Sequence, residues 1–236
     1  YDALTGRGML AWREGDVATT RRTFGAALRL MPRDSLALAY LARLPSPVDT
    51  SPLPPVERSA VTVVAARTGP RRFDVPDGRG GWRPFFIKAV NLGTALPGKF
   101  PSEFPADDST YERWIALAAA MNANAIRVYT IHPPHFYRAL AAWNVAHPEA
   151  PLWLVHGVWT ELPPGKRGER YDDAKWNAAF LAEMSRVVDL VHGRAIIRPR
   201  SGHADGRYTV DVSRWTLGWI LGREWEPYSV VAYNAA

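Results

Sequence analysis

The chain has 236 residues, of which 47% are hydrophobic and 22% are charged, a composition that favours a sizeable core and excludes wholesale disorder. It contains no Cys, which excludes disulfides and thiolate metal sites, and it lacks the run of about 18 apolar residues needed to cross a bilayer. We therefore expect a soluble protein without a membrane span, either cytoplasmic or exported. Because the chain starts at Tyr1 with no leader, we expect it to be a piece of a longer protein.

The net charge of +6 raises the question of nucleic-acid binding. Of the 29 basic residues 25 are Arg, and these are scattered along the chain without a basic block or a ladder of aromatic residues beside them. We therefore predict no nucleic-acid partner. The segment NLGTALPG at 91–98 is a poor match to a phosphate-binding GxGxxG loop, and no cofactor is predicted.

Helical periodicity begins at residue 3 and continues to 31, with a break at Gly15 and Asp16, and a further apolar helix runs from Ser35 through Leu44. This region predicts an all-α helical hairpin followed by another helix. It resembles a tetratricopeptide repeat, which implies a possible protein partner, although a plain helical hairpin would give the same periodicity. The resemblance is carried by Gly8, Gly15, Phe24, Ala27 and Pro32.

A Pro-rich stretch at 45–58 predicts a stiff linker between two domains. The expected division is a helical repeat at 1–44, the linker at 45–58 and a larger domain at 59–236. The larger domain begins with a Val- and Thr-rich segment, 59–66, that suits a strand, and a turn is expected at Asp77 and Gly78.

From residue 85 onwards, strand and helix patterns alternate along the chain, which predicts a parallel sheet with helices outside it. Open sheets and barrels both fit this order. The expected strands are 85–92, 125–131, 152–159 and 216–222, and the expected helices are 109–121, 134–144 and 172–192.

Each expected strand ends in polar or aromatic residues, and the carboxyl ends of parallel strands meet at one edge of a sheet. We therefore expect one polar and aromatic site, of the kind that binds sugars. These residues are Asn91 near the end of the first strand, Arg127, Tyr129 and His132 at the second, His156, Trp159 and Glu161 at the third, and Arg223, Glu224 and Glu226 at the fourth.

Three of these strand segments, FFIKAVNLG, NANAIRVYTIHPP and LGREWEP, resemble the first, second and fourth barrel strands of clan A glycoside hydrolases, especially family 2. The resemblance implies strands 1–4, the first half, of a (β/α)8 TIM barrel in an α/β protein. It implies a retaining glycoside hydrolase or transglycosylase acting on a polysaccharide or glycan. Glu224 would be the general acid/base, with Asn91 and Arg127 as supporting residues, and the nucleophile would lie on the seventh strand, outside these 236 residues.

Arg223 stands where the family has an Asn that holds the sugar 2-hydroxyl. The alternative function is therefore a non-catalytic glycan-binding or scaffold protein with a degenerate barrel. A buried salt bridge with Arg127 or Arg223 is the alternative role for Glu224, and Glu226 could instead form a carboxylate pair with it. The predicted substrate-binding residues are Asn91, Arg127, Tyr129, His156, Trp159, Arg223, Trp225 and Glu226.

Several further residues have two interpretations. His156 could bind substrate or satisfy a backbone group in the core, while His132 and His135 are more typical of a structural turn than of a metal site, so no metal is predicted. The loops 97–105 and 200–208 are expected to form the rims of the groove.

Overall fold

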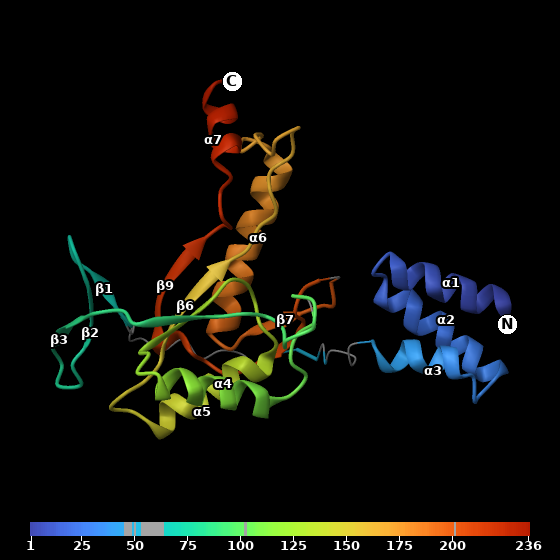
Figure 1. Ribbon diagram of the computed structural model, residues 1–236, viewed down its shortest axis with the longest axis horizontal. Helices are drawn as coiled ribbons and strands as arrows, with labels where there is room; N and C mark the ends of the chain where they lie inside the picture. The colour runs from blue at the N-terminus through green and yellow to red at the C-terminus, as the bar shows by residue number, and fades with distance from the viewer. Residues whose placement is uncertain (45–48, 50, 53–63, 102, 201) are drawn as a thin grey trace.

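The computed structural model describes residues 1–44, 49, 51–52, 64–101, 103–200 and 202–236 (Figure 1). Within these residues the protein is mixed α/β, with seven α-helices, a parallel sheet and two small antiparallel sheets. Most of the expected linker at 45–58 and the first part of the expected strand at 59–66 fall outside the described residues. Val64 to Ala66 are described and are not a strand.

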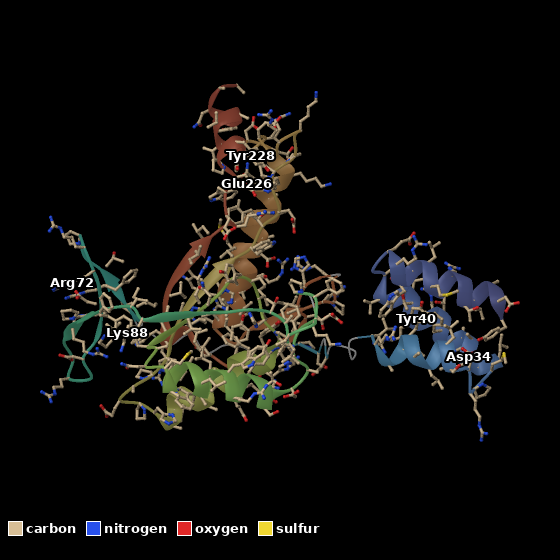
Figure 2. The ribbon with its side chains drawn as sticks, viewed as in Figure 1. Asp34, Tyr40, Arg72, Lys88, Glu226 and Tyr228 are labelled. Atoms are coloured by element: carbon tan, nitrogen blue, oxygen red, sulfur yellow. The ribbon has the colours of Figure 1, made fainter. Side chains whose placement is uncertain are left out.

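The first three helices are α1 (Asp2–Arg13), α2 (Val17–Leu30) and α3 (Ser35–Ala42), which confirms the predicted helices and the break at Gly15. The carboxylates of Asp16 and Asp34 cap α2 and α3 by accepting the backbone N–H of Thr19 and Ala37. The ring of Phe24 lies stacked against that of Tyr40, with centroids 4.8 Å apart; Figure 2 labels Asp34 and Tyr40. A Cβ at Gly8 would lie 2.8 Å from the Phe24 ring, so α1 approaches α2 closely only because this residue is Gly.

The small antiparallel sheet consists of β1 (Arg67–Thr68), β2 (Phe73–Pro76) and β3 (Trp82–Phe85). The turn between β2 and β3 is the predicted one. Asp77 accepts hydrogen bonds from the backbone N–H of Arg79 and Gly81, both at 2.8 Å, and Gly78 has a positive φ of 77°.

The single strand expected at 85–92 was wrong, because β3 ends at Phe85 and a separate strand, β4 (Ala89–Leu92), belongs to another sheet. The side chain of Asn124 explains the break. It donates to the carbonyl of Phe86 and accepts from the backbone N–H of Lys88, each at 2.8 Å, and so occupies backbone groups that a continuous strand would use. Figure 2 shows Lys88 in this connection.

The parallel sheet has the order β4, β5 (Ala125–Val128), β6 (Trp153–Val158) and β9 (Thr216–Leu221). Each of these strands pairs with the one before it, so the predicted alternation and parallel sheet are confirmed. The connecting helices are α4 (Asp108–Ala120), α5 (Pro134–Ala146) and α6 (Ala174–Val191), and α7 (Pro227–Asn234) follows β9 (Figure 1).

The two faces of the parallel sheet are covered differently. One face packs against α4, α5 and α6 in a single core that includes Ile115, Ile126, Leu140, Leu154 and Leu190. On the other face the amino ends of the strands pack against the small antiparallel sheet. That second core contains Val75, Phe85, Ala125, Trp153 and Leu217. The carboxyl ends of the strands on this second face border a cavity.

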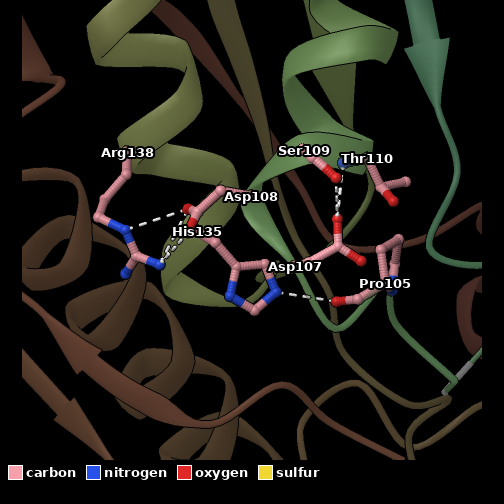
Figure 3. Close-up of polar contacts among 7 residues, drawn as sticks. All are labelled: Pro105, Asp107, Asp108, Ser109, Thr110, His135 and Arg138. Carbon is pink, nitrogen blue, oxygen red and sulfur yellow. Dashed lines mark hydrogen bonds and ion pairs between the residues drawn. The ribbon is translucent and has the colours of Figure 1, made fainter.

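Helices α4 and α5 meet at a polar junction (Figure 3). Asp107 caps α4 by accepting the backbone N–H of Thr110 at 2.8 Å, and Asp108 forms an ion pair with Arg138 of α5 at 2.9 Å. The Nε2 of His135 lies 2.8 Å from the carbonyl oxygen of Pro105. This junction fixes the amino end of α4 against the amino end of α5.

A hairpin of β7 (Ala195–Ile197) and β8 (Gly206–Tyr208) lies between α6 and β9, where the sequence pattern predicted a loop at 200–208. Tyr208 is buried, and its hydroxyl donates to the carbonyl of His132 at 2.9 Å. Arg207 donates to the carbonyl of Pro52 at 3.3 Å. Both side chains therefore bond within the protein, and neither lines the cavity.

Candidate functional site

A cavity of about 200 Å³ lies at the carboxyl ends of β5, β6 and β9. It brings together residues from three of the four strand ends that the sequence indicated. The lining residues are Arg127, Tyr129, Gly157, Trp159, Ile220, Gly222, Arg223 and Glu224.

Strand periodicity explains why these side chains share a face. Successive residues of a strand point to opposite faces, so Arg127 and Tyr129, two positions apart, point to the same one. In the register of the sheet Asn91 of β4 lies beside Arg127, and the Nη1 of Arg127 is 3.5 Å from the Oδ1 of Asn91. Asn91 is exposed on the edge strand and borders the cavity through this contact only.

Each of the two guanidinium groups at the cavity lies over an aromatic ring. The Cζ of Arg127 is 4.0 Å from the ring centroid of Tyr129, and that of Arg223 is 5.4 Å from the ring centroid of Trp159. The Nε of each Arg is buried and has no hydrogen-bond acceptor among the described residues. The aromatic rings therefore help to position two cationic groups at the cavity.

The carboxylate of Glu224 has no hydrogen bond and no ion pair with any described residue, and the side chain is exposed. The alternative of a buried salt bridge with Arg127 or Arg223 is therefore not formed. A carboxyl group that is free on a cavity wall can give a proton to a bound ligand or take one from it.

Trp225 does not line the cavity. Its ring packs against Gly222, where a Cβ would collide with the indole, and against Tyr171, Trp176 and Phe180. Gly222 has a φ of +81°, which turns the chain sharply at the end of β9. Trp225 therefore lies outside the cavity and packs against Gly222, which forms part of the cavity wall.

Glu226 is the N-cap residue of α7, as Figure 2 shows, and its carboxylate lies 3.7 Å from the Nη2 of Arg223. It does not line the cavity. Glu226 contacts a residue of the cavity wall, Arg223, through the ion pair with its guanidinium.

His156 lies on the opposite face of β6 and is fully buried. Its Nδ1 donates to the carbonyl of Gly157 at 2.8 Å, so its Nε2 accepts from the hydroxyl of Tyr137 at 2.7 Å. Burial lowers the pKa of His156 to about 4. Of the two roles considered for His156, these contacts favour the core role, and His156 does not reach the cavity.

His132 is likewise buried, and its Nδ1 lies 3.0 Å from the hydroxyl of Tyr111. Burial lowers the pKa of His132 to about 3, with smaller contributions from His156 and His135. In the part of the chain that the structure describes, no group of three His, Asp or Glu side chains could hold a metal ion.

Three cavity residues were missed from the sequence, namely Gly157, Ile220 and Gly222. Gly157 carried a usable signal, because a Gly inside a strand often marks a close approach of another backbone. A Cβ at Gly157 would lie 2.8 Å from the carbonyl oxygen of Val128. Ile220 had no such signal, since an apolar residue in a strand is usually core.

No protein-family model, curated protein or solved structure matches the chain. Among the described residues, none of the helices has the length and apolar character to span a membrane. Function must therefore be inferred from the cavity and its side chains.

Proposed function

We propose that the protein is a retaining glycoside hydrolase, or a transglycosylase, that acts on a polysaccharide or glycan with Glu224 as general acid/base. The observation that supports this most strongly is the free carboxylate of Glu224 on the wall of a cavity that also carries Arg127, Tyr129 and Trp159. Aromatic faces and forked donors are the groups that hold sugar rings and hydroxyls, and an unpaired carboxyl group can protonate a glycosidic oxygen.

We also propose that the parallel sheet forms strands 1–4 of a (β/α)8 TIM barrel. Each strand pairs with the one before it, and the connecting helices pack on one face of the sheet, as they do in such a barrel. The position of the cavity supports this, since barrel active sites lie at the carboxyl ends of the strands. An open doubly wound sheet would instead reverse its strand order at a switch point.

Retaining hydrolysis needs a second carboxylate about 5–5.5 Å from the first to act as the nucleophile. Among the described residues that line the cavity, Glu224 is the one carboxylate. The proposal therefore places the nucleophile outside the 236 residues. The pairing of Glu224 with Glu226 gains no support, because Glu226 lies against Arg223 and away from the cavity lining.

The three N-terminal helices are proposed as a tetratricopeptide-like unit that binds a protein partner. Their own small core of Phe24, Ala27 and Ala37 and the close contact at Gly8 support a repeat-like packing. Leu30 and Leu38 remain exposed on these helices, as expected of a unit that stacks against another.

The second candidate function is glycan binding without catalysis. Arg223 favours it, because an Arg stands at the position of the family's 2-hydroxyl-binding Asn and packs over Trp159. A binding protein also needs no second carboxylate.

The substitution Glu224→Gln tests the enzyme proposal when it is made in a protein that includes the proposed nucleophile, because it keeps the shape of the side chain and removes the acid. Release of reducing sugar from a panel of glycans should fall by about 10²–10⁴-fold. Circular dichroism and the unfolding midpoint should be unchanged, since Glu224 has no hydrogen-bond or ion-pair partner among the residues that the structure describes. Glu112→Gln is the matched control, because Glu112 is exposed on α4. Full activity in Glu224→Gln would refute the role, and a wild-type protein that binds glycans without cleaving them would support the second candidate.

A further inference from the structure

We propose that the cavity selects an acidic sugar and holds the carboxylate of a uronic acid unit with Arg127 and Arg223. This inference rests on the proposed function, because it takes the cavity as a sugar site and names the class of sugar. It concerns binding, so it can hold or fail independently of hydrolysis.

The charges of the cavity wall favour an anion. Two of its lining residues are cationic, Arg127 and Arg223, and Glu224 is the one anionic lining residue. Arg127 has no carboxylate partner among the described residues, and its polar contact is with the amide oxygen of Asn91 at 3.5 Å. Arg223 is only partly neutralised, since Glu226 lies 3.7 Å from one end of its guanidinium. A neutral sugar would leave the charge of Arg127 unbalanced.

The hydrogen-bonding capacity of the two guanidiniums indicates the same kind of ligand. Arg127 and Arg223 both line the cavity, and a guanidinium carries five N–H donors and no acceptor. A carboxylate has two oxygens and about four acceptor positions, and it can bind guanidinium groups in a bidentate manner.

The aromatic rings limit how the guanidiniums can move. The side chains of Tyr129 and Trp159 each support one guanidinium face. A stacked guanidinium keeps its edge, where its N–H groups lie, available for an in-plane acceptor. The site is therefore organised to recognise a planar anion before the ligand binds.

The size and polarity of the cavity orient such a ligand. Its volume of about 200 Å³ is below the range of roughly 300–1,000 Å³ typical of sites for drug-sized ligands, so it suits one sugar ring. Glu224 would repel the carboxylate of the sugar and attract its hydroxyl groups or its glycosidic oxygen. The two Arg side chains would thus bind the carboxylate of the sugar ring, and Glu224 would lie near its glycosidic oxygen.

The test compares sugars that differ at one carbon. Methyl glucuronide and methyl galacturonide are titrated into the protein beside methyl glucoside and methyl galactoside, which replace the carboxylate with a hydroxymethyl group. Binding is followed by calorimetry and by tryptophan fluorescence, to which Trp159 contributes. At least one uronide should bind about tenfold to a hundredfold more tightly than its neutral partner, because charge-assisted hydrogen bonds are gained. This preference should shrink as the salt concentration rises.

Two variants test whether the preference for the uronide arises in the cavity. Arg223→Asn should remove most of the preference for the uronide over its neutral partner, because one of the two guanidiniums is lost. Arg198→Asn makes the same change at an exposed position that does not line the cavity, and it should keep the preference. Inorganic phosphate is titrated as a separate arm, to distinguish a sugar site from a simple anion site.

The outcomes separate this inference from the proposed function. If neutral sugars bind as well as or better than uronides, the inference is overturned, while the glycan-site proposal stands. If uronides bind preferentially but no uronide-containing polymer is cleaved, the inference stands and the hydrolase proposal fails. If phosphate binds and no sugar does, or if neither class of sugar binds at millimolar concentration, the inference is overturned together with the sugar site.

Discussion

The hydroxyl of Tyr137 on α5 donates a hydrogen bond to the Nε2 of His156 on β6, with the two atoms 2.7 Å apart. The same hydroxyl accepts the backbone N–H of His132 at 3.3 Å. All three residues are buried, and the carbonyl of His132 accepts in turn from the hydroxyl of Tyr208. A buried polar network thus joins the helix layer to the strand that carries Gly157 and Trp159 on its cavity side.

Removal of the Tyr137 hydroxyl should destabilise the protein. In Tyr137→Phe the Nε2 of His156 and the N–H of His132 lose a partner in a site closed to water, at a cost of about 1–3 kcal/mol. Urea unfolding followed by circular dichroism measures the change. Tyr228→Phe is the control, because Tyr228 is about half exposed on α7 and its loss of a hydroxyl should be neutral. Equal stability of the two variants would contradict the role of the network.

The two buried histidines should make the protein less stable in acid. Burial lowers the pKa of His132 to about 3 and that of His156 to about 4, whereas an unfolded His has a pKa of about 6.5. Below pH 6.5 the unfolded chain therefore binds protons that the folded protein does not bind. The free energy of unfolding should be highest above pH 6.5 and should decrease as the pH falls towards 4.

The slope between pH 6 and 4.5 should reach about 1.4 kcal/mol per pH unit for each histidine. Urea unfolding at a series of pH values measures it. A free energy of unfolding that stays constant over this range would show that the two histidines are not buried in their neutral form.

Gly157 should not tolerate even a methyl group. In Gly157→Ala the new Cβ would lie 2.7 Å from the carbonyl carbon of Tyr129 and 2.8 Å from the carbonyl oxygen of Val128, both of them backbone atoms of the neighbouring chain segment. We expect a loss of stability of about 1–3 kcal/mol or more. If the cavity binds a sugar as we propose, this binding should also weaken, because Gly157 lines the cavity.

Gly218→Ala is the matched control for this change, since Gly218 lies in the adjacent strand β9 and a Cβ there would meet no atom within 4 Å. Its effect on unfolding should stay within about 0.5 kcal/mol. If the two substitutions have the same effect, the close approach of Tyr129 to Gly157 is not a constraint on the fold.

The N-cap of α4 should contribute more to the free energy of unfolding than the ion pair beside it (Figure 3). Asp107→Ala removes the side chain that accepts from Thr110, at an expected cost of about 0.5–2 kcal/mol. Asp108→Ala removes an ion pair with Arg138 whose two side chains are both nearly half exposed, and the expected cost is below about 1 kcal/mol. Thermal unfolding of both variants provides the comparison, and a larger loss in Asp108→Ala would contradict the assignment.

Local pattern was enough to predict the alternating helices and strands. Helix α6 shows why, because its apolar residues recur at steps of three and four and Asp173 caps its start by accepting the N–H of Trp176. The break between β3 and β4 was not predictable in this way. It depends on Asn124, which is 38 residues from Phe86 in the chain and meets it only in the folded protein.

Part of the candidate site could be predicted from the alternation of side chains along a strand, which places every second residue on the same face. Arg127 and Tyr129 are two apart in sequence, so they share a face in any strand, and the carboxyl ends of parallel strands lie at one edge. The same alternation places His156 on the opposite face of the strand from Gly157 and Trp159, because it lies one and three positions from them. Which of the two faces is the cavity and which is the core depends on where α5 places Tyr137, and no local pattern encodes that.

The sequence by itself determined the α/β order, the parallel sheet and the gathering of Arg127, Tyr129, Trp159, Arg223 and Glu224 at one edge, because short-range periodicity controls each of these. Only the tertiary structure decided that His156 is a core residue, that Trp225 packs outside the cavity, and that Glu224 has no partner within the described part of the chain. These outcomes depend on contacts between segments far apart in the chain, where packing rather than pattern selects the neighbours.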